Sequence, residues 1–148
     1  MKSGKIVELI HVGWREWIVL PNHDNFLIKA KIDTGARSSA LDANHIEEYH
    51  KDNQKWIKFR LNQHKRTLDI HTRLVKYKKI INSFGNTETR PVVIMKIQIG
   101  LKSWKTELTL TRRNHMSYPM LIGRSSLKQN YVIHSHQSYL KGKHLIAK

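Results

Sequence analysis

The sequence predicts a mainly β protein in which many short strands form a closed barrel or a sandwich. Most of the readable segments alternate apolar and polar residues with a period of two, which is typical of strands with one buried face. Turn-forming residues separate these segments, and the helical evidence is confined to two short stretches. The chain has 148 residues, 39% of them hydrophobic, which suits one domain with its own core. We therefore expect a single domain over residues 1–148 that ends in a short Lys-rich tail.

Five strands follow from the alternation. They are expected at residues 14–20, 26–32, 55–61, 92–101 and 103–111. The last two are separated by residues 100–103, which have the composition of a hairpin turn. Residues 62–90 contain no strand or helix that the pattern defines, although "NSFGNTE" at 82–88 has the composition of a hairpin tip.

Two short helices are expected. "DANHIEEYHK" (42–51) offers Asp42 or Asn44 as an N-cap, followed by acidic residues in the first turns. "RSSLKQN" (124–130) is the second candidate for a short helix.

The segment "FLIKAKIDTGARSSALDA" (26–43) carries the first candidate site. Its apolar residues alternate as far as Ile32, and the strand then stops at Asp33-Thr34-Gly35-Ala36. Asp33 falls on the face opposite the packed one, where Gly35 allows a sharp turn. An isolated Asp-Thr-Gly is most often an ordinary Asx-type turn, so its meaning depends on a second signal.

That second signal is "YPMLIGRSSLKQN", in which large apolar residues run into Gly123-Arg124 and then a short helix. The two motifs together resemble the retropepsin-like aspartic peptidases. In that family an apolar-Asp-Thr-Gly-Ala loop carries the catalytic carboxylate, and a later apolar-apolar-Gly-Arg segment threads beneath the loop. The matching stretches here are Ile32 to Ala36 and Leu121 to Leu127, about ninety residues further along.

Four longer stretches sharpen the resemblance: "KIDTGARSSALDA", "TETRPVV", "WKTELTLTRRNHMSYPMLIGR" and "SLKQNYVIHSHQSYL". They are similar to a bacterial branch often labelled ATP-dependent zinc protease, which includes the RimB-type proteins. The resemblance runs from about Val12 to Tyr139 and implies a retropepsin-like (acid protease) closed barrel with one or two short helices. It also implies a catalytic role for Asp33, Thr34 and Gly35. A substrate-binding role is implied for Ala36, Arg37, Arg90 and Arg124. For Arg124 a loop-capping role inside the fold is an equal alternative.

The expected mechanism needs a second carboxylate. Aspartic peptidases hydrolyse amides with two carboxyl groups that share one proton, and this chain has one Asp-Thr-Gly. A two-fold dimer would bring two copies of Asp33 together. Arg37 stands where the retroviral pattern often has an acid and would favour ionised Asp33. Residues between 42 and 90 are additional to a minimal retroviral half and could remodel the dimer.

We expect no metal and no bound cofactor. The chain has no cysteine and no His-Glu-x-x-His motif, and His45 and His50 are spaced poorly for one helical face. His134 and His136 would share a strand face, as surface histidines commonly do. No Gly-x-x-x-x-Gly-Lys-Ser/Thr loop for ATP is present. Any dependence on ATP would therefore come from a partner, and the resemblance implies ATP-grasp ligases that add glutamate as functional neighbours.

The charge is large and unevenly distributed. The formal net charge is +16, and residues 51–148 hold 21 of the 27 Lys and Arg but 4 of the 11 Asp and Glu. Such a field attracts polyanions. With the family resemblance, it favours an acidic peptide as substrate, such as the glutamylated tail of a small-subunit ribosomal protein. A solubilising surface is the simpler alternative, and Arg112-Arg113 in particular reads as a solvated turn.

Two other functions stay open from the sequence. A non-catalytic basic module could dock on ribosomal RNA, with bases stacking on aromatic residues that lie among the cations: Trp56, Phe59, Tyr77 and Trp104. An inactive scaffold could modulate the ligase. The cysteine-free composition suits the cytoplasm, and charged residues interrupt the N-terminal apolar stretch, so neither a signal peptide nor a membrane contact is expected.

Overall fold

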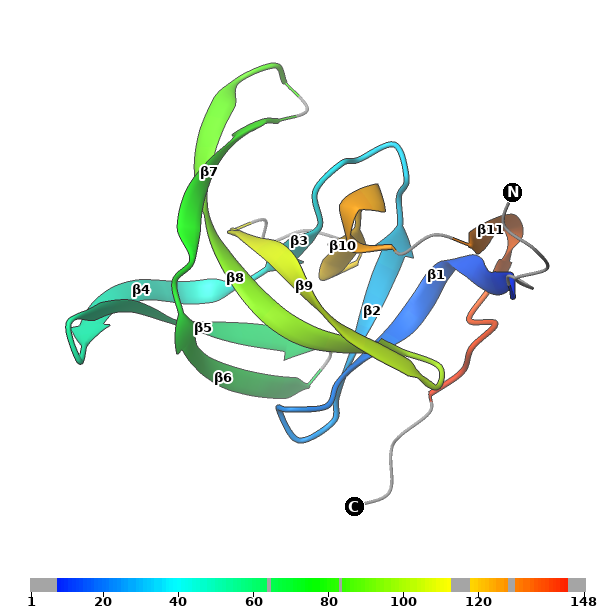
Figure 1. Ribbon diagram of the computed structural model, residues 1–148, viewed down its shortest axis with the longest axis horizontal. Helices are drawn as coiled ribbons and strands as arrows, with labels where there is room; N and C mark the ends of the chain where they lie inside the picture. The colour runs from blue at the N-terminus through cyan, green and yellow to red at the C-terminus, as the bar shows by residue number, and fades with distance from the viewer. Residues whose placement is uncertain (1–7, 64, 83, 113–117, 128–129, 144–148) are drawn as a thin grey trace, which may run out of the picture.

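The computed structural model describes residues 8–63, 65–82, 84–112, 118–127 and 130–143. These residues form strands and one short 3-10 turn (Figure 1). The elements are β1 (Ile10–Leu20), β2 (Phe26–Ile32), β3 (Ala40–Asp42), β4 (Asn44–Lys51), β5 (Gln54–Gln63), β6 (Arg66–Arg73), β7 (Lys76–Ile81), β8 (Thr87–Ile99), β9 (Lys102–Thr111), β10 (Met120–Ile122), η1 (Arg124–Ser126) and β11 (Tyr131–Ser138).

The larger sheet closes into a barrel. Its strand order is β11-β1-β2-β10-β3-β9-β8-β7, and the pairing of Val19 in β1 with Gln98 in β8 joins the ring. The closed part therefore runs β1-β2-β10-β3-β9-β8, while β7 and β11 extend it on either side. The β2–β10 and β3–β9 pairs are parallel and the other pairs of the ring are antiparallel. This mixed barrel confirms the retropepsin-like fold expected from the sequence.

A second sheet, β4-β5-β6, packs against the barrel. Along β5 every second residue is buried, and this face joins the same hydrophobic core as the barrel strands through Ile57, Phe59, Leu61 and, from β6, Ile70. The strands of this sheet come from the segment that is additional to a minimal retroviral half. The pattern predicted β5 but neither β4 nor β6.

The prediction of a helix at residues 42–51 is wrong. Residues Asn44–Lys51 form β4, which is antiparallel to β5 with Glu47 opposite Lys58 and Tyr49 opposite Trp56. The acidic residues that suggested a helical first turn instead lie on a strand, where cross-strand pairing outweighs local propensity. The other expected helix is reduced to a single 3-10 turn, η1, and part of 124–130 lies outside the described residues.

The remaining strands agree with the alternation. Strands β1, β2, β5, β8 and β9 include or closely match the five expected segments, and Gly100, at a φ of 60°, makes the β8–β9 turn. The expected hairpin tip at 82–88 joins β7 to β8, with the Asn82 side chain accepting hydrogen bonds from the amides of Phe84 and Asn86. Arg113 and the end of the Lys-rich tail lie outside the described residues. No helix among the described residues has the length and apolar character that crossing a membrane requires.

Candidate functional site

Asp33 lies at the end of β2, on the loop that leads to β3. The alternate residues of β2 from Phe26 to Ile32 are buried in the core, whereas Lys31 on the other face is exposed. This burial pattern is the one that the sequence predicted. Asp33 itself is partly exposed, and Thr34 and Gly35 after it are exposed.

The backbone of this loop is fixed by three hydrogen bonds of ordinary length. The Asp33 amide donates to the carbonyl of Ile122 in β10 at 2.8 Å. The Asp33 Oδ1 accepts from the Gly35 amide at 3.1 Å, and the Asp33 carbonyl accepts from the Ala36 amide at 3.2 Å. The carboxylate is therefore held at a tight turn and oriented by its own backbone.

Gly123 allows the segment after β10 to pass against this loop. A Cβ atom at Gly123 would lie 2.6 Å from the Ser38 carbonyl oxygen and 2.9 Å from that of Ala36, which is too close for any side chain. The neighbouring amides of Arg124 and Ser125 donate to the carbonyls of Ala36 and Arg37, at 2.9 and 3.0 Å. The two sequence motifs thus lie in direct contact.

The Arg124 side chain also contacts the loop, in addition to the Arg124 backbone amide. Its Nη1 donates to the carbonyls of Thr34 and Gly35 at 3.3 and 3.2 Å. This is the loop-capping alternative for Arg124, and the side chain does not line the adjacent groove described below.

A buried hydroxyl network, which the sequence did not reveal, fastens the two segments together. The Ser39 hydroxyl accepts from the Gly123 amide at 2.9 Å and is hydrogen-bonded to the Ser126 hydroxyl. Thr106 of β9 donates to the Ser126 hydroxyl at 2.8 Å. Both serines end an Arg-Ser-Ser triplet, which follows the first motif and forms part of the second, and that repetition is the signal that could have pointed to them.

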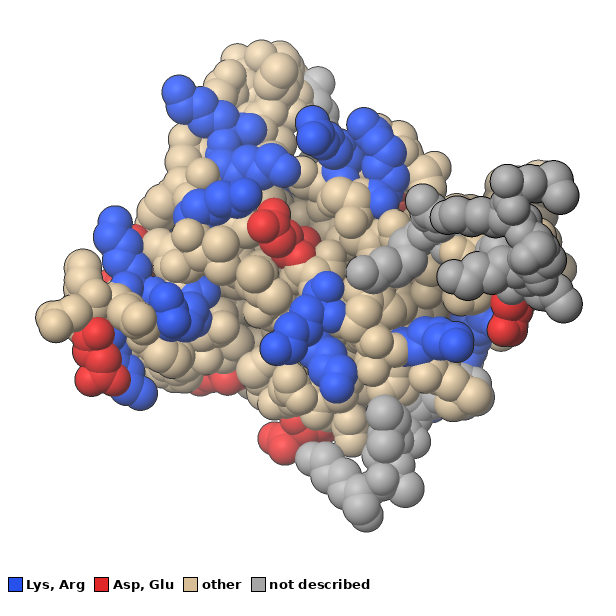
Figure 2. Space-filling view, in the orientation of Figure 1, with Lys and Arg blue, Asp and Glu red and all other residues tan. Residues whose placement is uncertain are grey.

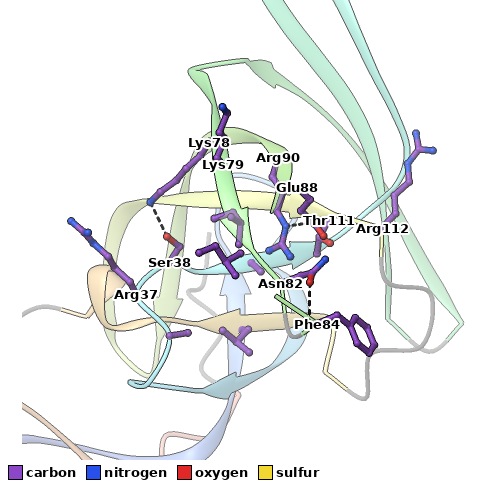
Figure 3. Close-up of a pocket in the computed structure, with 15 residues that line it drawn as sticks. Arg37, Ser38, Lys78, Lys79, Asn82, Phe84, Glu88, Arg90, Thr111 and Arg112 are labelled. Carbon is purple, nitrogen blue, oxygen red and sulfur yellow. Dashed lines mark hydrogen bonds and ion pairs between the residues drawn. The ribbon is translucent and has the colours of Figure 1, made fainter. Parts of the chain in front are cut away.

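An open groove of about 780 Å³ lies between the loop and the β7–β8 hairpin (Figure 3). Ala36, Arg37 and Ser38 line it from the loop, but Asp33 does not. Lys78 reaches across from the hairpin, and its Nζ donates to the Ser38 hydroxyl at 2.8 Å. The hairpin is therefore tied to the Asp33 loop through a charged side chain.

The groove is predominantly cationic. Its charged lining is one carboxylate, that of Glu88, and five cations: Arg37, Lys78, Lys79, Arg90 and Arg112. Figure 2 shows Lys and Arg side chains both on the hairpin and on the facing surface above β3 and β10, with acidic side chains in the minority. Such a surface is suited to carboxylate groups.

The groove cations differ in solvent exposure and in whether they already have a protein partner. Arg90 is 8% exposed, and its Nε donates to Glu88. Arg112 donates to the Ile46 carbonyl at 3.3 Å and is exposed, as is Arg37. Arg37 and Arg90 therefore both line the groove, but Arg90 is already part of an ion pair.

Tyr77 joins the base of the hairpin to the second sheet. Its hydroxyl donates to Glu48 Oε1 at 3.0 Å. Partial burial and, after it, this hydrogen bond raise the pKa of Tyr77, so the phenol remains a protonated donor at neutral pH. The contact anchors β7 to β4.

The described residues contain no group of three or more His, Cys, Asp or Glu side chains arranged to hold a metal ion. His134 Nε2 lies 2.7 Å from Nδ1 of His11, in a hydrogen bond across the β1–β11 pair. His136 is exposed.

Curated relatives share most of this chain but are longer. Three proteins named "Probable alpha-L-glutamate ligase" match it: one from Shewanella pealeana at 33% identity over 88% of this chain, one from Desulfotalea psychrophila at 35% over 82%, and one from Parasynechococcus marenigrum at 35% over 90%. The matched part is 30%, 27% and 29% of those proteins, respectively. The chain thus spans less than a third of their length.

A solved structure has the same fold. A protein of unknown function from Legionella pneumophila, 27% identical, superposes with a TM-score of 0.78 over 89% of this chain and 98% of its own. The family model for RimB-like proteins, described as retropepsin-like aspartic endopeptidase RimB, matches residues 11–144. Since that match covers nearly the whole barrel and both motifs, the chain belongs to the RimB-like family of retropepsin-like proteins.

Proposed function

We propose that this protein is an aspartic-type peptidase that uses Asp33. The observation that carries the proposal is the placement of Asp33, on a braced and partly exposed loop beside a cationic groove. Membership of the RimB-like family supports a hydrolytic role for that carboxylate.

The chemistry proposed is hydrolysis of an amide by two carboxyl groups that share one proton. The ionised group activates water, and the protonated one polarises the carbonyl of the scissile bond. Because the chain has one Asp-Thr-Gly, the second group is Asp33 of another copy related by a two-fold axis. The exposure of Thr34 and Gly35 leaves this loop accessible to such a copy, and Thr34 would brace the two loops against each other.

The proposed substrate is an acidic chain, such as a glutamylated tail of a ribosomal protein. Carboxylates would meet the groove cations, of which Arg37 is exposed and Lys78 can exchange its Ser38 partner for a ligand. Relatives named as glutamate ligases support an association with a ligase system of the ATP-grasp type that makes such chains. A non-catalytic module, binding the same chains without cleaving them, is the alternative.

Mass spectrometry of a peptide with an oligoglutamate tail tests the chemistry. Wild type should shorten the peptide, whereas Asp33→Asn should lower the rate by at least about 100-fold, since general acid–base groups commonly contribute that much. Asp24→Asn is the matched control, because Asp24 is exposed in a turn at a φ of 55°, a conformation that asparagine tolerates. Binding without cleavage by wild type would favour the non-catalytic module.

Mixing experiments test the two-fold site separately. At a fixed amount of wild type, excess Asp33→Asn should depress activity below that of wild type alone, because mixed dimers contain a single ionisable Asp33. Activity that depends only on the amount of wild type would contradict a shared site and favour one carboxylate per active site.

A further inference from the structure

The outer face of the β4-β5-β6 sheet has no role in the proposed peptidase. While the inner residues of β5 enter the core, the alternate residues point away from it. Strand register puts the following residues on this outer face: Glu47, Tyr49, Lys51, Gln54, Trp56, Lys58, Arg60, Asp69, His71 and Arg73. None of them lines the groove beside Asp33.

Two aromatic rings lie side by side on this face. Tyr49 and Trp56 are direct cross-strand partners, with ring centroids 6.5 Å apart and planes inclined by 31°. His71 meets the edge of Tyr49, and its Nδ1 is 3.3 Å from the Tyr49 hydroxyl. The Trp56 Nε1 atom is buried, so the part of the indole that reaches the surface is carbon ring. The two neighbouring rings, tilted by 31°, form an aromatic platform on which other rings can stack.

Cations surround the platform. Lys51 Nζ lies 5.0 Å from the centroid of the Trp56 ring, and Arg73 is the register partner of Trp56 on the other side. Across the whole face Lys51, Lys58, Arg60 and Arg73 stand against Glu47 and Asp69.

Both carboxylates on the face are engaged by neighbouring cations. Glu47 lies 3.4 Å from Lys58, and Asp69 lies 2.7 Å from Arg60. The hydrogen bond from Arg60 lowers the pKa of Asp69, so this acid stays ionised and paired rather than repelling an incoming anion. The cations on either side of the rings therefore define the local field.

Flat rings between cations fit single-stranded nucleic acid better than they fit an acidic peptide. Every base has a π-face that stacks on an aromatic side chain, and each nucleotide brings a phosphate for a flanking cation. An oligoglutamate chain can satisfy the cations but has no group for the rings. Of the four aromatic residues that the sequence suggested for stacking, Trp56 alone lies on this face. Phe59 is buried in the core. Tyr77 and Trp104 belong to β7 and β9, where they donate to Glu48 and to the Ser126 carbonyl, respectively.

We propose that the outer face of β4–β6 binds a short single-stranded nucleic acid, with bases stacked on Tyr49 and Trp56 and phosphates contacted by Lys51 and Arg73. This binding is separate from the proposed peptidase and does not depend on it. It assigns to the additional sheet a recognition role beside the barrel that carries Asp33.

Fluorescence anisotropy with a labelled ten-nucleotide oligo(U) at low salt tests the proposal. Trp56→Ala should weaken binding at least about fivefold, since one stacked base contributes about 1–3 kcal/mol. Trp56→Phe, which keeps a ring, should retain most of the affinity and shows that loss in Trp56→Ala is not a general packing defect. A thermal melt of each variant confirms that it is folded.

The charge contribution needs its own control. Lys51→Gln should weaken binding and make it less salt-dependent, whereas Lys105→Gln, the same change at an exposed position on β9, should have a smaller effect. Equal effects of these two variants, wild-type binding by Trp56→Ala, or no binding of oligo(U) at low salt would overturn the proposal. So would an equal loss in Trp56→Ala of affinity for an oligoglutamate peptide, because the face would then be a general polyanion or protein surface. Asp33→Asn should bind oligo(U) like wild type, whatever its effect on cleavage.

Discussion

Glu16 shows how much of this molecule depends on single polar residues in buried places. It is fully buried in β1, in a chain whose charged residues are otherwise mostly at the surface. Its carboxylate accepts from three backbone amides: Gly13 at 2.6 Å, Leu140 at 2.9 Å and Lys141 at 3.1 Å. The residue therefore fastens the segment after β11 to the first strand.

We expect Glu16→Gln to destabilise the protein by about 2 kcal/mol, because charge-assisted hydrogen bonds are lost and an amide group faces backbone donors. For a chain of this size the thermal midpoint should fall by about 4–8 °C. Glu107→Gln is the control, since Glu107 is exposed and its contact with Lys76 is 3.6 Å long, a type of pair that contributes about 0–1 kcal/mol. Equal midpoints for the two variants would show that the three amides find other partners.

Residues differ in how far the sequence could place them. Asp33 was predictable, because strand alternation fixes its face and a second motif gives the turn a context. Ser39 and Ser126 were not, since a serine acquires its importance from which distant segments pack around it, and here the two are 87 residues apart. The role of Arg124 was ambiguous for the same reason: the loop carbonyls it contacts are about ninety residues away.

At the level of elements, the long strands with an alternating sequence were predictable, whereas the three-residue ring strands β3 and β10 and several edge strands were not. Strands β2 and β5 show clean alternation because one face of each is buried. In β8 and β9 the sequence alternates, although residues 97–99 and 108–111 are buried on both faces. Strands β4 and β7 are mostly exposed on both faces, so their sequences carry little periodic signal. Their conformation comes from hydrogen bonding to β5 and β8, which only the tertiary structure reveals.

The β7–β8 hairpin is the element on which access to the groove depends. Its base is fixed to β4 through Tyr77 and Glu48, and its middle is tied to the Asp33 loop through Lys78 and Ser38. The tip beyond these contacts exposes Ile81 and Phe84 at 75% and 89%. The position of the hairpin over the groove should thus respond to the Lys78 contact.

Hydrogen exchange can measure that response. We expect Lys78→Met to speed amide exchange in β7 by about fivefold, because a hydrogen bond of about 1 kcal/mol to the loop is lost. Lys79→Met provides a control at the next residue, which is exposed and lines the same groove. Unchanged exchange in Lys78→Met, or the same acceleration in both variants, would mean that the Ser38 contact does not hold the hairpin.

For the whole molecule, the excess of Lys and Arg is found on two separate surfaces. The hairpin and its groove carry one set of cations, and the outer face of β4–β6 carries another. The net charge of +16 attracts any polyanion from a distance, so attraction alone does not separate the two surfaces. Any discrimination must come from local chemistry: the groove offers cations to the proposed acidic chain, whereas the outer face also offers aromatic rings to the proposed nucleic acid.

Binding of an oligoglutamate peptide should therefore depend steeply on salt and on Arg37. Screening lengths fall from roughly 8 Å at physiological ionic strength to about 3 Å at 1 M, so the attraction of exposed groups should weaken strongly over that range. Arg37→Gln should lower affinity for the peptide several-fold more than affinity for oligo(U), because Arg37 is exposed and lines the groove but is not among the residues of the outer face of β4–β6. Arg37 is a cleaner probe than Arg90, because the Arg90 guanidinium already pairs with Glu88.

The measurement is a pair of titrations at matched ionic strength, with Lys105→Gln as the charge-matched control. Equal losses for both ligands would show that peptide and nucleic acid bind one shared surface. Tight oligo(U) binding without detectable peptide binding would show that the groove binds nucleic acid and not acidic chains.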